Sequence, residues 1–377
     1  MSETLFRHPG AVDLHDHFRA PSEHNNAEDF QSGTQAAAIG GYVIANDMPN
    51  TPKHETWTAE RVEEKYEIIE RDSYIPTGVI GGMQPEADNL TEIPKMVPLV
   101  TAFKQYYTKT QDNDIELGPE DFREGTEQIH VTDPTKLVMA HAGEDIEGII
   151  GMVAVDTKQP LHFCHVNSPE TVRRIQSMER QYGLTVTKGV TPHHLFKSSF
   201  DTRTEGWFAR MQPPLTEQGD AEELFDMLVN GDIDIVETDH APHSLNAKQK
   251  VESENPTCEE DGASCFGVTN IEFALPMLFY QAKLGRISME RLVEVTSTAP
   301  ARIIGVNLSD RTSVDWDLSH EYRIGDEGVV SGSRWTPFQG KLAVGKVIGM
   351  KVGEKTVINQ GLLADRNSSV VRNGSII

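Results

Sequence analysis

Near its start the sequence reads VDLHDHFR, from Val12 to Arg19, a short apolar run that leads into two histidines. Side chains two residues apart in a β-strand point to the same side, so an extended segment here puts His15 and His17 together. Imidazole is the commonest metal-binding side chain, and Arg19, next in the same alternation, offers a cation to an anionic group. The stretch therefore predicts a strand that ends at a metal site beside an anion-binding arginine.

Seven further apolar runs of similar length follow along the chain. Together they predict eight strands, at 12–15, 42–46, 78–80, 99–104, 137–141, 161–165, 184–190 and 233–238. Amphipathic segments between several of them, such as 58–71, 169–181 and 221–230, predict helices. Repeated βα units favour an α/β fold, a (β/α)8 barrel of the TIM type, which we expect over residues 12–304.

The character of the sequence changes after residue 304. Gly-bounded β runs follow one another without helices between them, which predicts a small β appendage formed by residues 1–11 and 305–377, mainly by the C-terminal segment. Two long polar stretches, 108–135 and 245–264, interrupt the barrel pattern, and we expect loops there that cover an active site.

The overall charge narrows the class of partner. The chain has 377 residues, with 34 Lys and Arg against 58 Asp and Glu, a net charge of −24 that argues against nucleic acid or an anionic membrane as the main partner. No segment is apolar over the roughly 18 residues that a membrane helix needs. We therefore expect a cytoplasmic protein with a small-molecule substrate. Its three cysteines, odd in number and without a Cys-x-x-Cys pair, are expected to be reduced thiols.

Metal-ligand side chains recur where the predicted strands end, the edge at which barrel enzymes build their sites. They are His15, His17, His141, His165 and Asp239, and a further predicted strand ends at Lys104. Four imidazoles and one carboxylate suit Zn²⁺ or a similar ion better than Ca²⁺ or Mg²⁺. The set is large enough for two metal ions, and the sequence leaves the choice between one and two open. The other nearby histidines, His162, His193, His194 and His240, are expected to pack or to support the ligands.

Taken in series, the motifs resemble the amidohydrolase superfamily and, within it, the dihydroorotase family. The matching segments cover almost the whole chain in that family's order: DLHDHFR at 13–19, MPNT at 48–51, FKQY at 103–106, HAGED at 141–145, LHFCHV at 161–166, TPHHL at 191–195, PPL at 213–215, TDHAPH at 238–243 and TAPAR at 298–302. The resemblance implies a metal-dependent hydrolase of cyclic amides on a TIM barrel.

The resemblance also implies a ligand set for two Zn²⁺ or similar divalent ions. One ion would be held by His15, His17 and Asp239, and the other by His141 and His165. Lys104, carboxylated by CO₂, would bridge both. The activity implied is the reversible hydrolysis of (S)-dihydroorotate to N-carbamoyl-L-aspartate by a hydroxide shared between the two metals, in de novo pyrimidine (UMP) biosynthesis. Asp239 would also pass the proton to the departing amide nitrogen.

The same resemblance assigns the substrate contacts. Arg19, Asn50 and His243 would hold the substrate carboxylate, Thr110 would supply a loop hydroxyl, and Gln212 would also contact the substrate. The chain departs from the family pattern here, because Gln212-Pro-Pro-Leu-Thr216 stands where the family has Asn-Pro-Pro-Leu-Arg. These departures leave the contacts to the ring amides open.

Two alternatives remain open from the sequence. A hydantoinase, dihydropyrimidinase or allantoinase would share the metals but would need no clamp for a carboxylate. An inactive dihydroorotase-like scaffold of aspartate transcarbamoylase would usually lack metal ligands, whereas this chain has all six. As partners we expect either a second copy, giving a homodimer, or aspartate transcarbamoylase.

Overall fold

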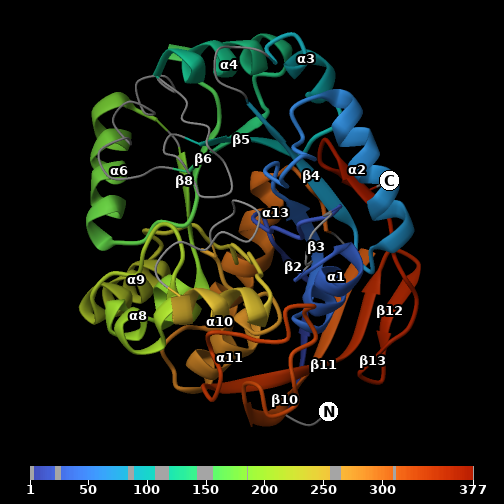
Figure 1. Cartoon of the computed structure of the whole chain (residues 1–377), viewed down its shortest axis with the longest axis vertical. Coiled ribbons are helices and arrows are strands. Elements are labelled where there is room, and N and C mark those ends of the chain that lie inside the picture. Colours follow the sequence, from blue (N-terminus) through green and yellow to red (C-terminus); the bar gives the residue numbers. More distant parts are fainter. Residues whose placement is uncertain are drawn as a thin grey trace.

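A curled parallel sheet forms the centre of the molecule (Figure 1). The computed structural model describes residues 4–21, 27–83, 89–106, 119–141, 156–184, 186–254, 265–308 and 311–376. Within these ranges eight strands pair in parallel in chain order: β2 (Ala11–Val12), β3 (Tyr42–Asp47), β4 (Thr77–Gly82), β5 (Ala102–Tyr106), β6 (Leu137–His141), β7 (Leu161–Phe163), β8 (Val186–Val190) and β9 (Ile235–Val236). The predicted (β/α)8 barrel of the TIM type is confirmed.

The first and last strands of the sheet meet just beyond their regular ends. Asp16 forms parallel bridges to both Asp47 and His240, and the backbone N–H of His17 donates to the carbonyl of His240 over 2.8 Å. This link brings the segment after β2 against the segment after β9. Two stretches that lie more than 200 residues apart in the chain therefore share one edge of the barrel.

Helices surround the sheet (Figure 1). They are α1 (Phe30–Ile39), α2 (Ala59–Asp72), α3 (Ile93–Met96), α4 (Pro119–Thr132), α6 (Pro169–Tyr182), α7 (Pro192–Phe196), α8 (Ser199–Glu205), η2 (Gly206–Ala209), α9 (Gln218–Asn230), α10 (Leu245–Glu254), α11 (Ala274–Lys283), α12 (Met289–Val293), η3 (Glu294–Thr298) and α13 (Ala299–Ile303). In α6, Ser168 caps the N-terminus by accepting from the N–H of Thr171, and Gly183 ends the helix with φ 66°.

The expectation of loops over 108–135 and 245–264 is wrong where the structure describes these stretches. Helix α4 occupies much of the first stretch and α10 much of the second. Polar composition misled the prediction, because a helix that lies on a protein surface buries only one stripe of side chains.

A second, antiparallel sheet forms the appendage, in the strand order β1 (Leu5–His8), β10 (Thr312–Arg323), β11 (Leu342–Val352), β12 (Lys355–Asn359) and β13 (Leu362–Leu363). Trp316 in β10 is fully buried and packs on the Phe279 ring of α11, with 4.9 Å between ring centroids. A Cβ at Gly41, whose φ is +87°, would lie 2.2 Å from the Trp316 ring. Gly41 therefore lets the appendage sit directly against the barrel.

The last two strands return to the barrel. β14 (Val370–Arg372) pairs in parallel with the start of β4, and β15 (Ser375–Ile376) pairs with β14. The hydroxyl oxygen of Tyr66 lies 2.8 Å from the carbonyl oxygens of both Leu99 and Val371, so it can donate its proton to either one. The C-terminal end is thereby fastened beside α2, where Figure 1 places it.

Candidate metal centre

The ends of β5 and β6 and the segments just after β2, β7 and β9 bring the proposed metal ligands to one edge of the barrel. His15 Nε2 lies 3.4 Å from Asp239 Oδ1, and His17 Nε2 lies 3.2 Å from the same oxygen. These three residues offer ligand atoms that all lie within 4.8 Å of one another. They form a group that could hold a metal ion.

The second pair of histidines lies beside the first. His141 Nδ1 and His165 Nε2 are 3.0 Å apart, and the rings of His15 and His165 have centroids 5.1 Å apart. Burial is the main cause that lowers the pKa of His15, His141 and His165, with neighbouring positive charge, including that of Lys104, contributing. For His141 the pKa falls to about 3. The imidazoles are therefore neutral at pH 7, the form in which they bind metals.

Lys104 completes the set from β5. Its side chain is fully buried, and its Nζ has no oxygen or nitrogen partner among the described residues. A buried ammonium without an anionic partner is costly. A nearby metal pair with a carboxylated lysine would remove that cost. The residues present thus suit a metal centre.

Backbone strain marks three residues of this region. Arg19, His165 and Asp239 have positive φ values of 55°, 39° and 46°. Such conformations cost about 1–3 kcal/mol each in non-glycine residues and cluster at functional sites. His165 was expected at the end of a strand and Asp239 directly after one, but β7 ends at Phe163 and β9 at Val236. The early ends turn both side chains toward the site.

The predicted substrate contacts fall into two groups. Asn50 and Gln212 line a small cavity at the site together with His17, and Asn50 Oδ1 lies 2.9 Å from His17 Nδ1. If His17 donates from Nδ1 to that oxygen, its Nε2 lone pair stays available to a metal. Asn50 can therefore orient a ligand as well as contact a substrate. Thr110 lies outside the described residues.

Arg19 and His243 contact each other instead of lining that cavity. Arg19 Nη2 lies 3.1 Å from His243 Nε2, and Arg19 Nε donates to the Pro242 carbonyl over 2.8 Å. The same His243 nitrogen lies 2.7 Å from the Phe266 carbonyl. A neutral ring can satisfy only one of these contacts at Nε2, because the guanidinium needs an acceptor and the carbonyl needs a donor. Burial and the Arg19 charge lower the pKa of His243 well below its usual value.

Sequence reasoning missed several residues at the site. Tyr106, Ala241, Phe266 and Gly267 line the cavity, and the carboxylate of Glu237 lies behind the histidines. Tyr106 could have been found, because it follows Lys104 by two positions on the same strand. The four histidines expected in supporting roles do have other contacts; for example, His240 Nε2 lies 3.2 Å from Glu28 Oε2.

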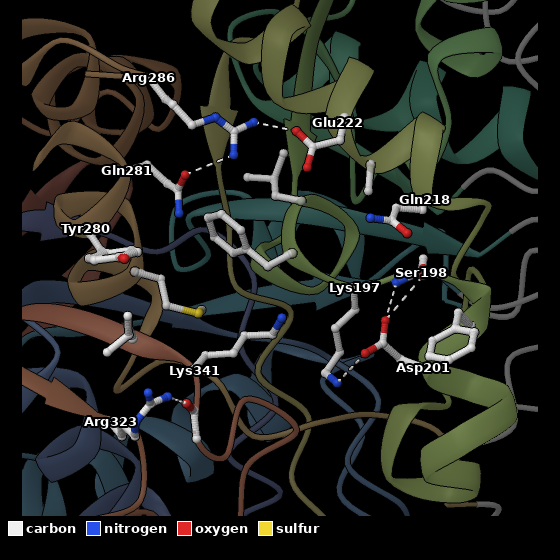
Figure 2. Close-up of a pocket in the computed structure, with 17 residues that line it drawn as sticks. Lys197, Ser198, Asp201, Gln218, Glu222, Tyr280, Gln281, Arg286, Arg323 and Lys341 are labelled. Atoms are coloured by element: carbon white, nitrogen blue, oxygen red, sulfur yellow. Dashed lines mark hydrogen bonds and ion pairs between the residues drawn. The ribbon is translucent and has the colours of Figure 1, made fainter. Parts of the chain in front are cut away.

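A larger cavity, of about 580 Å³, lies elsewhere, between α7, α8, α9, α11 and the appendage (Figure 2). Its charged groups largely pair with one another: Lys197 Nζ lies 3.2 Å from Asp201 Oδ1, and Arg286 Nη2 lies 2.5 Å from Glu222 Oε2. None of the proposed site residues lines it. Size alone therefore does not identify the functional site.

The structure corrects the expectation about the cysteines. Cys164 is free and buried, but Cys265 is disulfide-bonded, so the expectation of three reduced thiols is wrong. Disulfide pairing depends on which thiols the fold brings together, which the count and spacing could not reveal.

Among the described residues, every helix is too short or too polar to cross a membrane.

Comparison with known proteins assigns the family. The chain is 30% identical over 371 residues to a dihydroorotase of Halobacterium salinarum, covering 89% of this chain and 82% of that protein. The chain belongs to the dihydroorotase family. It is also 30% identical to the multifunctional protein CAD of Squalus acanthias over 92% of this chain, which spans 14% of that protein. No protein-family model matches it.

Solved structures agree on the architecture. An L-hydantoinase (dihydropyrimidinase) from Arthrobacter aurescens superposes with a TM-score of 0.86 at 22% identity, covering 97% of this chain and 89% of that one. At this level of identity the likeness concerns the fold alone. The predicted membership of the dihydroorotase family and the predicted barrel are both confirmed.

Proposed function

We propose that this chain is a dihydroorotase, a hydrolase that reversibly opens the cyclic amide of (S)-dihydroorotate to N-carbamoyl-L-aspartate in pyrimidine biosynthesis. The observation that carries the proposal is the convergence of His15, His17 and Asp239 with two further imidazoles and a buried lysine, in a chain of this family; among the described residues, that lysine has no oxygen or nitrogen partner. A structural role alone would not require so many ligand-type groups at one barrel edge.

The donor set suits two divalent ions such as Zn²⁺. His15, His17 and Asp239 would hold one, His141 and His165 the other, with carboxylated Lys104 between them. When bound, such ions supply a hydroxide at neutral pH and polarise the ring carbonyl. The neutral state of the buried imidazoles leaves their lone pairs available for this.

Asp239 would handle the proton. Its carboxylate is largely buried, lines the cavity and lies at the rim of the histidine cluster. In hydrolysis it would accept a proton as the carbonyl is attacked and deliver it to the departing amide nitrogen. In ring closure it would take that proton back.

The substrate carboxylate would be held by Arg19, with Asn50 and His243 contributing further donors. Arg19 and His243 already lie in contact, and a carboxylate that accepted from the guanidinium would add a charge-assisted hydrogen bond. Gln212 lies on the cavity wall and would face the ring. Thr110 stays in the proposal as a substrate contact.

Turnover measured on three rings tests this function. The purified, metal-loaded protein is assayed with dihydroorotate, hydantoin and dihydrouracil. We expect turnover of dihydroorotate at a kcat/KM well above that of the neutral rings. Turnover of the neutral rings alone would favour a hydantoinase-type enzyme, which would need no clamp for a carboxylate. Absence of bound metal, with no turnover of any ring, would favour an inactive scaffold.

Three further assignments accompany the function. We infer that residues 12–304 form the catalytic barrel and that residues 1–11 and 305–377 form the appendage, apart from β14 and β15, which join the barrel sheet beside β4. As partners we propose either a second copy or aspartate transcarbamoylase, and as location the cytoplasm. Size-exclusion chromatography with light scattering, with and without a transcarbamoylase, tests the choice of partner.

A further inference from the structure

Glu237 is a buried carboxylate that the proposed chemistry does not use. It follows β9 directly, two residues before Asp239, and its side chain is fully buried. Oε1 accepts from the backbone N–H of His165 over 2.6 Å, and Oε2 lies 3.3 Å from His162 Nε2. One carboxylate thus fixes the backbone of a proposed metal ligand and lies beside a second ring.

The same carboxylate faces a third histidine from behind. His15 turns Nε2 toward Asp239 Oδ1 at 3.4 Å, while its Nδ1 lies 3.8 Å from Glu237 Oε2. This Nδ1 is buried and makes no hydrogen bond to any residue that the structure describes. An imidazole that binds a metal through one nitrogen almost always donates its other N–H to a carboxylate, a carbonyl or water. Among these, Glu237 is the carboxylate that His15 faces.

Gly189, on the neighbouring strand β8, makes room for this group. A Cβ at position 189 would lie 2.5 Å from Glu237 Oε1, 2.6 Å from its Cδ and 3.0 Å from His162 Nε2. Any side chain there would compete with the carboxylate for the same volume. Gly189 and Glu237 therefore depend on each other, because the missing side chain on one strand leaves the volume that the carboxylate after the next strand fills.

A direct ligand role for Glu237 is the main alternative. His15, Cys164 and Glu237 also offer ligand atoms within 4.8 Å of one another. Burial raises the pKa of the Cys164 thiol, which opposes the thiolate that a metal would need. Both carboxylate oxygens of Glu237 are already engaged on the side of His165 and His162. These contacts favour support of the ligands over coordination.

We propose that Glu237 is a positioning residue of the metal centre, which holds His15 in the tautomer with a proton on Nδ1 and fixes the His165 backbone without itself binding metal. The proposal rests on the proposed function only in assuming that the centre binds divalent ions. Its consequence is that metal affinity, and not only turnover, depends on a carboxylate in this volume.

The test measures metal binding directly. Metal-free wild type, Glu237→Gln, Glu237→Ala and the double variant Glu237→Ala with Gly189→Asp are titrated with Co²⁺ against a chromophoric chelator, and the visible spectrum of the bound ion is recorded. Glu272→Gln is the matched control, because Glu272 is also a buried carboxylate that accepts from backbone N–H groups, those of Val330 and Ser331. Urea unfolding of the metal-free proteins reports on folding.

We expect Glu237→Gln to weaken Co²⁺ binding by about 10- to 100-fold and to change the spectrum, since it keeps an acceptor for His165 but loses the charge facing His15. Gly189→Asp should restore at least part of the affinity lost in Glu237→Ala, because its carboxylate projects into the same volume. Wild-type affinity and spectrum in Glu237→Gln would overturn the proposal. If saturated Glu237→Gln bound one ion fewer per chain than the wild type, the proposal would be overturned in favour of direct coordination by Glu237. Metal binding without turnover of dihydroorotate by the wild type would instead refute the proposed function alone.

Discussion

Replacing Arg19 by Met removes the one cation that we assign to the substrate carboxylate. The guanidinium lies 3.1 Å from His243 Nε2 and 2.8 Å from the Pro242 carbonyl, so it is held in place before any substrate binds. A hydrogen bond to a charged group contributes about 1.5–3 kcal/mol. At about 1.4 kcal/mol per factor of ten, its loss should raise the KM for dihydroorotate by about 10- to 100-fold.

Steady-state rates measured in both directions check this expectation. The KM for dihydroorotate and for carbamoyl aspartate should rise together, because both carry the carboxylate, while kcat changes little. Turnover of dihydrouracil, which lacks that carboxylate, should stay as it is in the wild type. Arg71→Met is the control. The Arg71 side chain is exposed, and among the described residues it forms an ion pair only with its neighbour Asp72. A wild-type KM for dihydroorotate in Arg19→Met would refute the reasoning that selects this substrate.

Three further outcomes follow from the structure. Asp239→Asn should lower kcat by at least about 100-fold, with little change in the urea midpoint; a smaller loss would rule out its role in proton transfer. Burial lowers the pKa of His8 to about 3, so protonating the unfolded chain below pH 6.5 destabilises the fold. From pH 7.5 to pH 5 the wild type should therefore lose about 2 kcal/mol of unfolding free energy relative to His8→Gln, and parallel pH profiles would contradict this. Gly41→Ala should destabilise by about 2–4 kcal/mol, because its Cβ would meet the Trp316 ring; an unchanged urea midpoint would show that the appendage sits otherwise.

The barrel could be predicted because each strand is a short apolar run between polar segments. Strands β3, β4 and β6 lie within two residues of their predicted bounds. The ends next to the site were less accurate: β7 stops at Phe163 and β9 at Val236. The predicted strands continue past these points, but the chain turns with positive φ at His165 and Asp239. Hydrophobic periodicity does not reveal a turn that points a side chain toward a site.

Residue type indicated the proposed ligands, but their supporting contacts depend on packing between strands. The contact between His17 and Asn50 joins residues 33 positions apart, and that between Glu237 and His162 joins residues 75 positions apart. Glu237 is an ordinary glutamate in the sequence, and only the neighbouring Gly189 gives it space. Local patterns contain no information on such pairs. The roles of the site residues therefore remain proposals that mutation and metal binding can test.

Titration of the metal-free protein with Zn²⁺ in bicarbonate buffer, while dihydroorotate turnover is followed, tests the central claim most directly. Our account predicts no turnover without metal and a rise that reaches its plateau at two ions per chain. Full turnover in the metal-free protein, or none at any metal occupancy, would contradict it.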